Sequence, residues 1–136
     1  MDTLSPSNHT DYQSILNSIT DGVLTVDREM IITSFNRAAE KITHVRQSEA
    51  IGRHCFEVMR ADVCESGCAI QETFKTGKPC QNIPVYIVRA DNKRIPISVT
   101  TGIVQDDKGN VIGGVETFRD LSELNKLRRE FYKKHS

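Results

Sequence analysis

The stretch that decides the fold reads Arg94-Ile95-Pro96-Ile97-Ser98-Val99-Thr100-Thr101. Ile, Val and finally Thr stand at every second position from Ile95 to Thr101, with Pro or a polar residue between them. Strict alternation of this kind is typical of a β-strand with one buried face. Because a turn signal at Asp91-Asn92 precedes the run, we predict a strand over residues 94–105.

Four other stretches have a strand-like composition. We predict that they form strands over residues 22–27, 30–35, 82–90 and 111–119. Short helical patterns lie between the second and third of the five strands. Because strands stand at both ends and helices between them, this order predicts an α+β domain whose antiparallel sheet packs on one face.

Caps and helix breakers mark the limits of the helical patterns. Asn36 is a residue type that favours the N-cap, and it precedes a short run with helical spacing. Another helix is expected to begin at Cys68, and Gly77 and Pro79 follow it in the usual order of helix breakers. A third stretch, residues 48–60, looks helical at its start and less regular near Gly52.

The two ends of the chain differ from the predicted domain. We expect residues 1–10 to be a flexible lead-in and residues 11–20 to form a helix with an apolar stripe. Residues 121–135 approximate a heptad seam on an otherwise charged helix. Such a helix has no core of its own, so we predict that it pairs with its own copy in a parallel homodimer. A basic, solvated tail is the alternative interpretation.

Composition limits the function classes that need consideration. The 136 residues fit one domain, and 18 Lys and Arg balance 18 Asp and Glu. This balance gives no global positive field, so we expect no direct contact with nucleic acid and no attraction to an anionic membrane. No apolar run approaches the roughly 20 residues that span a bilayer, and the start lacks a secretory signal pattern. We therefore expect a cytoplasmic location.

All four cysteines lie in one segment of the chain. Cys55, Cys64, Cys68 and Cys80 have the spacing C-x8-C-x3-C-x11-C. In a reducing compartment, clustered cysteines bind metal or act in catalysis more often than they form disulfides. Four thiolates are enough to complete a tetrahedral metal site or to hold an iron–sulfur cluster. The C-x2-C pairs of zinc ribbons and ferredoxins are missing, however.

Three interpretations of these cysteines remain open. An iron–sulfur cluster would make the chain a redox or oxygen sensor, and this is our leading cofactor hypothesis. Zinc on the same four thiolates would be a closed structural site. In the third interpretation there is no metal, and the cysteines are small buried apolar residues or thiols that pair on oxidation.

Catalytic motifs are absent from the sequence. A thiol oxidoreductase would need a resolving cysteine close to its nucleophile, usually as C-x-x-C, and Cys64 and Cys68 are one residue too far apart for that motif. No Ser-His-Asp set, zinc H-E-x-x-H motif or G-x-G-x-x-G motif supports another chemistry. We therefore predict a sensory binding module and no enzyme.

Several segments together resemble the PAS domain family over about residues 12–123. They are Ile15-Leu16-Asn17-Ser18-Ile19-Thr20-Asp21-Gly22-Val23, Val26-Asp27, Ile32-Thr33-Ser34-Phe35-Asn36-Arg37-Ala38-Ala39, Ile51-Gly52-Arg53, Glu72-Thr73 with Gly77, Ile95-Pro96-Ile97, and Gly113-Gly114-Val115 with Phe118-Arg119-Asp120. The resemblance implies a five-stranded antiparallel sheet with helices over one face. It also implies a sensor of ligands, redox state or light that signals to an attached output domain.

The resemblance divides the chain into a PAS domain at residues 11–120 and a signalling linker helix at residues 121–136. Two stretches resemble the connection to the ATPase module of sigma-54-dependent transcription activators: Phe118-Arg119-Asp120-Leu121-Ser122-Glu123-Leu124 and Lys133-Lys134-His135-Ser136. The chain has no G-x-x-x-x-G-K-[ST] motif, so that ATPase would lie outside it. A sensor of a histidine kinase is the alternative, and so is a cofactor-free PAS dimerisation module. The resemblance places the cysteines in the helical crossing that walls the PAS ligand pocket.

Overall fold

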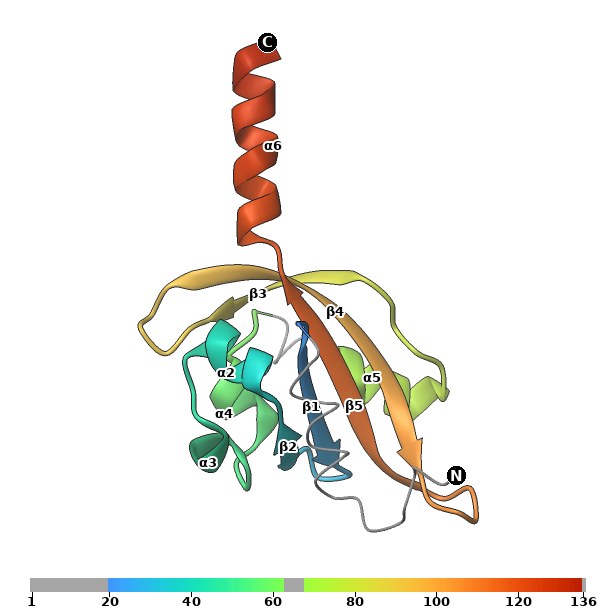
Figure 1. The fold of residues 1–136 in the computed structure, drawn as a ribbon. Helices are drawn as coiled ribbons and strands as arrows, with labels where there is room; N and C mark the ends of the chain where they lie inside the picture. The colour runs from blue at the N-terminus through green and yellow to red at the C-terminus, as the bar shows by residue number, and fades with distance from the viewer. Residues whose placement is uncertain (1–19, 63–67, 136) are drawn as a thin grey trace, which may run out of the picture.

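The strands form one antiparallel sheet in a computed structural model that describes residues 20–62 and 68–135. The five strands are β1 (Gly22–Asp27), β2 (Ile32–Phe35), β3 (Ile83–Val88), β4 (Arg94–Gln105) and β5 (Val111–Asp120). Their order across the sheet is β2-β1-β5-β4-β3, so the first and last strands pair at its centre. Figure 1 shows β4 and β5, the two longest strands, crossing the domain. The predicted α+β fold is confirmed.

The alternation in β4 is the clearest agreement between sequence and structure. Ile95, Ile97, Val99 and Thr101 are all buried, whereas the residues between them are partly exposed. Their side chains join those of Leu24, Phe35 and Phe118 in the core on the inner face of the sheet. One face of the sheet therefore supplies most of the core.

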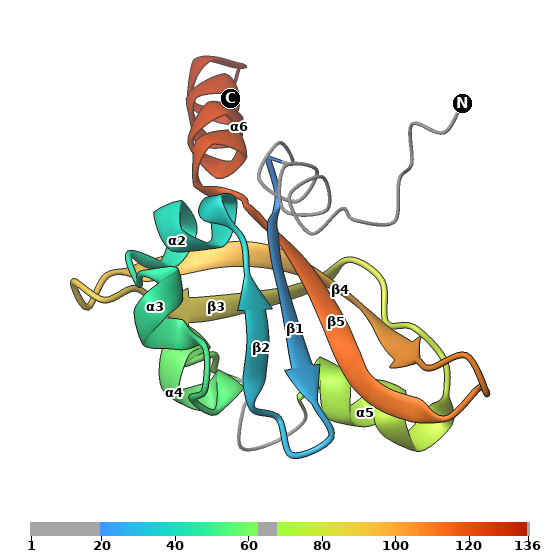
Figure 2. The same ribbon diagram turned by 60° about the horizontal axis from the view of Figure 1, so that its bottom comes forward.

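Four short helices cover this inner face. They are α2 (Arg37–Thr43), α3 (Gln47–Ala50), α4 (Cys55–Met59) and α5 (Ala69–Thr76). α2 packs on β1, α3 packs on β2, and α5 packs on both β4 and β5. Figure 2 shows α2, α3 and α4 grouped together, with α5 behind β5. The helices leave room for a cavity between themselves and the sheet.

Two of the predicted caps are confirmed. The Asn36 side chain accepts a hydrogen bond from the backbone N–H of Ala39 at 2.9 Å, which satisfies one of the unpaired donors at the start of α2. At the end of α5, Gly77 adopts the left-handed conformation with φ 72°. Asn36 therefore starts α2 and Gly77 ends α5, as their residue types predicted.

Two predicted strand limits need correction. β2 begins at Ile32 and not at residue 30, because Met30 has a left-handed φ of 66° and belongs to the turn after Asp27. β3 covers Ile83–Val88 and not residues 82–90, because Asn82 is also left-handed and Arg89 begins the next turn. Residues 48–60 contain two short helices. The predicted lead-in and the helix at residues 11–20 lie, except for Thr20, outside the described residues.

The C-terminal helix α6 (Ser122–His135) leaves the domain directly after β5. Only Leu121 separates the two elements, and its backbone N–H donates to the carbonyl of Pro96 on β4 at 2.8 Å. Figure 1 shows that α6 projects away from the sheet. Within the described residues, the helices are all too short or too polar to cross a membrane.

Candidate functional site

A small cavity lies in the core between the sheet and the helices. Its volume is about 30 Å³. The residues that line it come from α4, α5, the adjoining loops and three strands: Cys55, Met59, Ala61, Cys68, Ala69, Val85, Ile87, Ile97, Val99 and Glu116. All are apolar residues or cysteines except Glu116. We call this space the inner cavity.

Glu116 is the charged residue of the inner cavity. It stands on β5 directly opposite Leu24 of β1 and Thr101 of β4, so the three side chains share the inner face of the sheet. Only 7% of Glu116 is exposed. Burial raises the pKa of its carboxyl group to about 7, because an apolar environment disfavours the charged form. No described hydrogen bond or neighbouring charge contributes to this shift.

Glu116 was not among the site residues predicted from the sequence. The sequence nevertheless indicates its inward orientation, because residues two apart on a strand share a face. Phe118 is a large apolar residue near the end of β5 and fixes which face of this strand is buried. Glu116, two residues earlier, must then also point inward. A charged residue on the inner face of a central strand is a candidate functional residue.

A second pocket opens beside the inner cavity. Its volume is about 140 Å³. Its lining residues are Glu29, Met30, His54, Cys55, Phe56, Cys68 and Gln71. Because Cys55 and Cys68 line both spaces, these two residues stand between the pocket and the inner cavity. We call this second space the outer pocket.

The structure brings together only part of the predicted cysteine site. Cys55 is the first residue of α4 and is buried, and Cys68 is the N-cap of α5 and is half-buried. Both residues line the wall of the cavity, as the resemblance implied. Cys64 lies outside the described residues.

Cys80 occupies a different environment. It lies in the loop before β3. Its sulfur lies 3.7 Å from the Ala69 carbonyl oxygen and 3.7 Å from the Thr73 hydroxyl. Among the described residues there is no group of three or more His, Cys, Asp or Glu side chains arranged to hold a metal ion. The four-cysteine site depends on Cys64 and stays a prediction.

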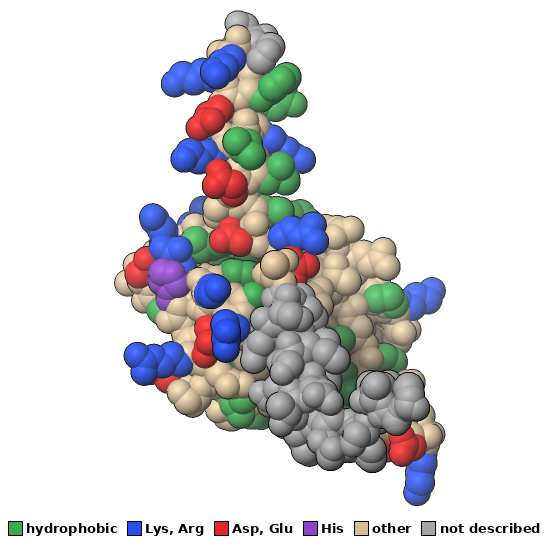
Figure 3. All heavy atoms as spheres, viewed as in Figure 1, with side chains coloured by type: hydrophobic (Ala, Val, Ile, Leu, Met, Phe, Trp, Pro, Cys, Tyr) green, Lys and Arg blue, Asp and Glu red, His purple; other side chains and the backbone are tan. Residues whose placement is uncertain are grey.

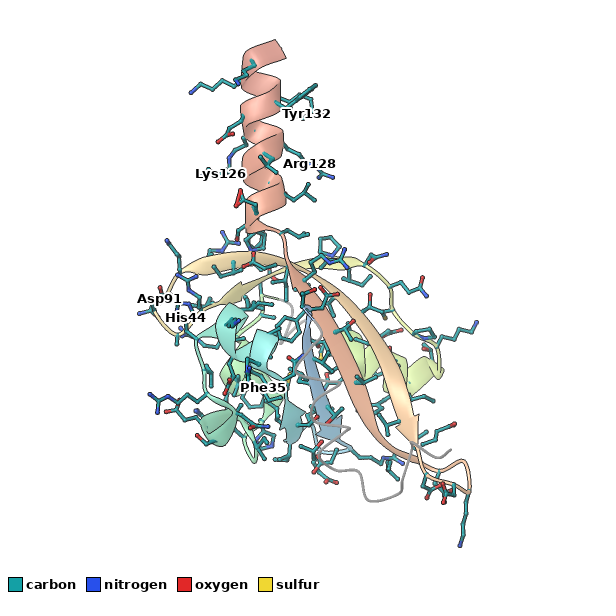
Figure 4. The ribbon with its side chains drawn as sticks, in the orientation of Figure 1. Phe35, His44, Asp91, Lys126, Arg128 and Tyr132 are labelled. Atoms are coloured by element: carbon teal, nitrogen blue, oxygen red, sulfur yellow. The ribbon has the colours of Figure 1, made fainter. Side chains whose placement is uncertain are left out.

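The exposed face of α6 is the second candidate site. Leu124, Leu127 and Phe131 are 44%, 55% and 56% exposed, and we call them the α6 seam. In Figure 3 the apolar side chains of α6 gather along one side of the helix, and charged groups dominate the other. Figure 4 shows Lys126 on the opposite side from Arg128 and Tyr132. An exposed apolar stripe of this kind marks an interaction surface.

Comparison with known proteins identifies the fold family. A family model described as "PAS domain" matches residues 20–123. The chain belongs to the PAS domain family. Solved PAS structures have the same fold: a PAS domain from Colwellia psychrerythraea has a TM-score of 0.73 at 12% identity, over 84% of this chain and 97% of that one. The PAS domain of nitrogen regulation protein NR(II) from Vibrio parahaemolyticus has a TM-score of 0.66 at 17% identity, over 80% of this chain and 96% of the other.

Curated relatives of this PAS domain include a histidine-protein kinase and a sensor protein. The signal transduction histidine-protein kinase AtoS of Escherichia coli is 28% identical over 115 residues, which are 85% of this chain and 18% of AtoS. Sensor protein CitS of Halalkalibacterium halodurans is 30% identical over 122 residues, which are 87% of this chain and 20% of CitS. The chain therefore spans about a fifth of the length of these relatives.

Proposed function

We propose that this chain is the PAS sensor domain of a histidine kinase. In this proposal a small ligand in the inner cavity changes the packing around Glu116, and β5 passes the change to α6. The domain itself carries out no catalysis, and the kinase domain to which α6 leads supplies the output. The relatives favour this alternative over the sigma-54 activator that the linker resembles, because AtoS is a histidine-protein kinase and two further relatives are probable C4-dicarboxylate sensor kinases.

The observation that carries the proposal is the short path from the cavity to the helix. Glu116 lines the cavity, β5 ends at Asp120, and α6 begins at Ser122. Six residues of extended chain span only about 20 Å. The hydrogen bond from Leu121 to Pro96 also joins this junction to β4, whose inner face lines the same cavity. A shift of either strand therefore moves the start of α6.

A homodimer would convert this shift into a signal. The α6 seam is exposed in the monomer, and pairing with a second copy would bury it. Two packings of the helix pair would then correspond to two states of the kinase. A ligand can bias such an equilibrium only by binding one state more tightly, so the cavity must differ between the two states.

The nature of the stimulus is a separate part of the proposal. A metal or iron–sulfur cluster on the four cysteines would provide a redox signal. Cys55 and Cys68 support this possibility through their place in the cavity wall. A small organic ligand needs no metal, and Glu116 supports that possibility in the same cavity.

A chimera with AtoS provides the experiment. The chain replaces the matched 115-residue region of AtoS, and autophosphorylation is measured. Leu124→Lys with Leu127→Lys places like charges in the α6 seam and should change autophosphorylation severalfold. Lys126→Ala with Arg129→Ala alters the opposite side of the helix and should leave it within about twofold of the unaltered chimera. Equal activity in all three chimeras would refute signalling through α6.

A further inference from the structure

We propose that the inner cavity and the outer pocket together bind a small primary amine, with its ammonium group against Glu116. This inference rests on the proposed sensor function and names its ligand class. The charge, the size and the apolar character of the two spaces all favour such a ligand.

Charge decides the class of ligand. The two spaces contain two carboxylates, Glu116 in the inner cavity and Glu29 in the outer pocket. Among the described lining residues there is no Lys or Arg, and His54 is the one basic group. A carboxylate in an apolar environment lacks the stabilisation that water gives, so a bound cation that donates hydrogen bonds restores it. An anionic ligand would meet repulsion from both carboxylates.

The position of Glu116 makes it the recognition group. Its side chain points from the centre of the sheet into the inner cavity, among walls of Val, Ile, Met and Cys. None of the interactions described for this chain gives its carboxylate a partner, while its neighbour across the sheet, Thr101, is already bonded to Thr73 at 2.6 Å. Glu116 is therefore an acceptor for a ligand that donates hydrogen bonds.

Size sets the length of the ligand. A water-sized group needs about 10–15 Å³ of cavity volume. The inner cavity of about 30 Å³ then accepts about two non-hydrogen atoms, which fits an ammonium nitrogen and the carbon attached to it. The outer pocket of about 140 Å³ accepts about ten more, and Met30 and Phe56 give it an apolar wall for a short hydrocarbon body. Cys55 and Cys68 line both spaces, so a ligand that fills both must lie against these two side chains.

Three probes of similar size test the inference on the purified 136-residue chain at pH 8. They are n-butylammonium, neutral 1-butanol and the dianion succinate, and isothermal titration calorimetry measures their affinities. We expect n-butylammonium to bind at least tenfold more tightly than 1-butanol, and succinate not to bind. Equal affinity for the amine and the alcohol, tighter binding of succinate, or no amine binding would each overturn the inference.

Variants locate the recognition group. Glu116→Gln keeps the shape of the side chain and should weaken the binding of n-butylammonium at least tenfold. The affinity for 1-butanol should change less than twofold. Glu72→Gln is the matched control, because it removes the same charge from the exposed side of α5 and should change neither affinity. Loss of amine binding in Glu29→Gln but not in Glu116→Gln would contradict the assignment to Glu116. Circular dichroism checks that each variant is folded.

The outcome separates this inference from the proposed function. If the amine does not bind while the AtoS chimera still depends on the α6 seam, the ligand class is wrong and the sensor function stands. If substitutions in the α6 seam do not change the autophosphorylation of the chimera, the proposed signalling function fails, whatever the chain binds.

Discussion

Replacing Glu116 with Gln should stabilise the fold at pH 8 by about 3 kcal/mol. The carboxyl group has a pKa of about 7 in the folded chain, compared with the ordinary value of 4.5. Each tenfold change in an acidity constant is worth about 1.4 kcal/mol, so keeping Glu116 ionised in the folded state costs about 3 kcal/mol above pH 7. Gln has the size of the protonated carboxyl group and avoids this cost.

The gain in stability from Glu116→Gln should become smaller as the pH falls. Because the folded state has the higher pKa, it binds more protons than the unfolded state between pH 4.5 and 7. The contribution of Glu116 is therefore most favourable below the unfolded pKa and is lost as pH rises through the folded pKa. At pH 5 most of the folded carboxyl groups are protonated, so the advantage of Gln should fall to about 1 kcal/mol.

Urea unfolding at pH 5, 6, 7 and 8, followed by circular dichroism, measures this difference. Asp91 and Asp106 have lowered pKa values, through the Arg89 side chain and through hydrogen bonds from Asn110, but they are common to both proteins and cancel in the comparison. Glu72→Gln serves as the exposed control and should show no pH-dependent gain. A Glu116→Gln gain that is the same at every pH, or a less stable Gln variant at pH 8, would refute the burial argument.

Four further predictions concern the fold, the dimer and the cysteines. Asn36→Ala should cost about 2 kcal/mol in urea unfolding, because the buried side chain caps α2 and also accepts from the Val23 N–H at 2.9 Å; a loss below about 0.5 kcal/mol would contradict this role. Gly113→Ala should cost about 2 kcal/mol or more, since its methyl group would overlap the Val26 carbonyl oxygen, whereas Gly102→Ala meets only the Val115 side chain at 3.5 Å and should cost less than half as much. Leu124→Lys with Leu127→Lys should have a lower sedimentation coefficient than the dimeric wild type at high micromolar concentration, because like charges in the α6 seam weaken the dimer. A wild type that is itself monomeric at that concentration would contradict a dimer of this chain. Anaerobic purification followed by iron, zinc and sulfide analysis tests the four-cysteine site: iron with sulfide or stoichiometric zinc would support it, and metal-free protein would contradict it.

The sheet could be predicted because its buried face has a period that is visible in the sequence. Ile95, Ile97 and Val99 alternate with more polar neighbours, and this alternation is a direct consequence of strand geometry. The limits of β2 could not be predicted in the same way. Met30 is apolar and suits a strand, but the turn after Asp27 forces it into a left-handed conformation, which an apolar pattern does not reveal.

The candidate site was harder to predict than the fold. The sequence drew attention to the cysteines because they cluster along the chain, and Cys55 and Cys68 do line the cavity. Cys80 is close to these cysteines in sequence, but from the loop before β3 its sulfur contacts Ala69 and Thr73 of α5 instead. Tertiary packing, and not distance along the sequence, decides which side chains meet. Glu116 was missed because an inward-pointing charge contradicts the pattern by which strands are recognised.

We infer that α6 responds to the state of Glu116 in the inner cavity. The most direct measurement is autophosphorylation of the AtoS chimera with Glu116→Gln, compared with Glu72→Gln and the unaltered chain. Because Gln holds the site permanently uncharged, we expect Glu116→Gln to change kinase activity severalfold and to make it insensitive to n-butylammonium. The Glu72→Gln chimera should behave as the unaltered chimera does. Identical activity in all three chimeras, with all of them folded, would contradict the claim.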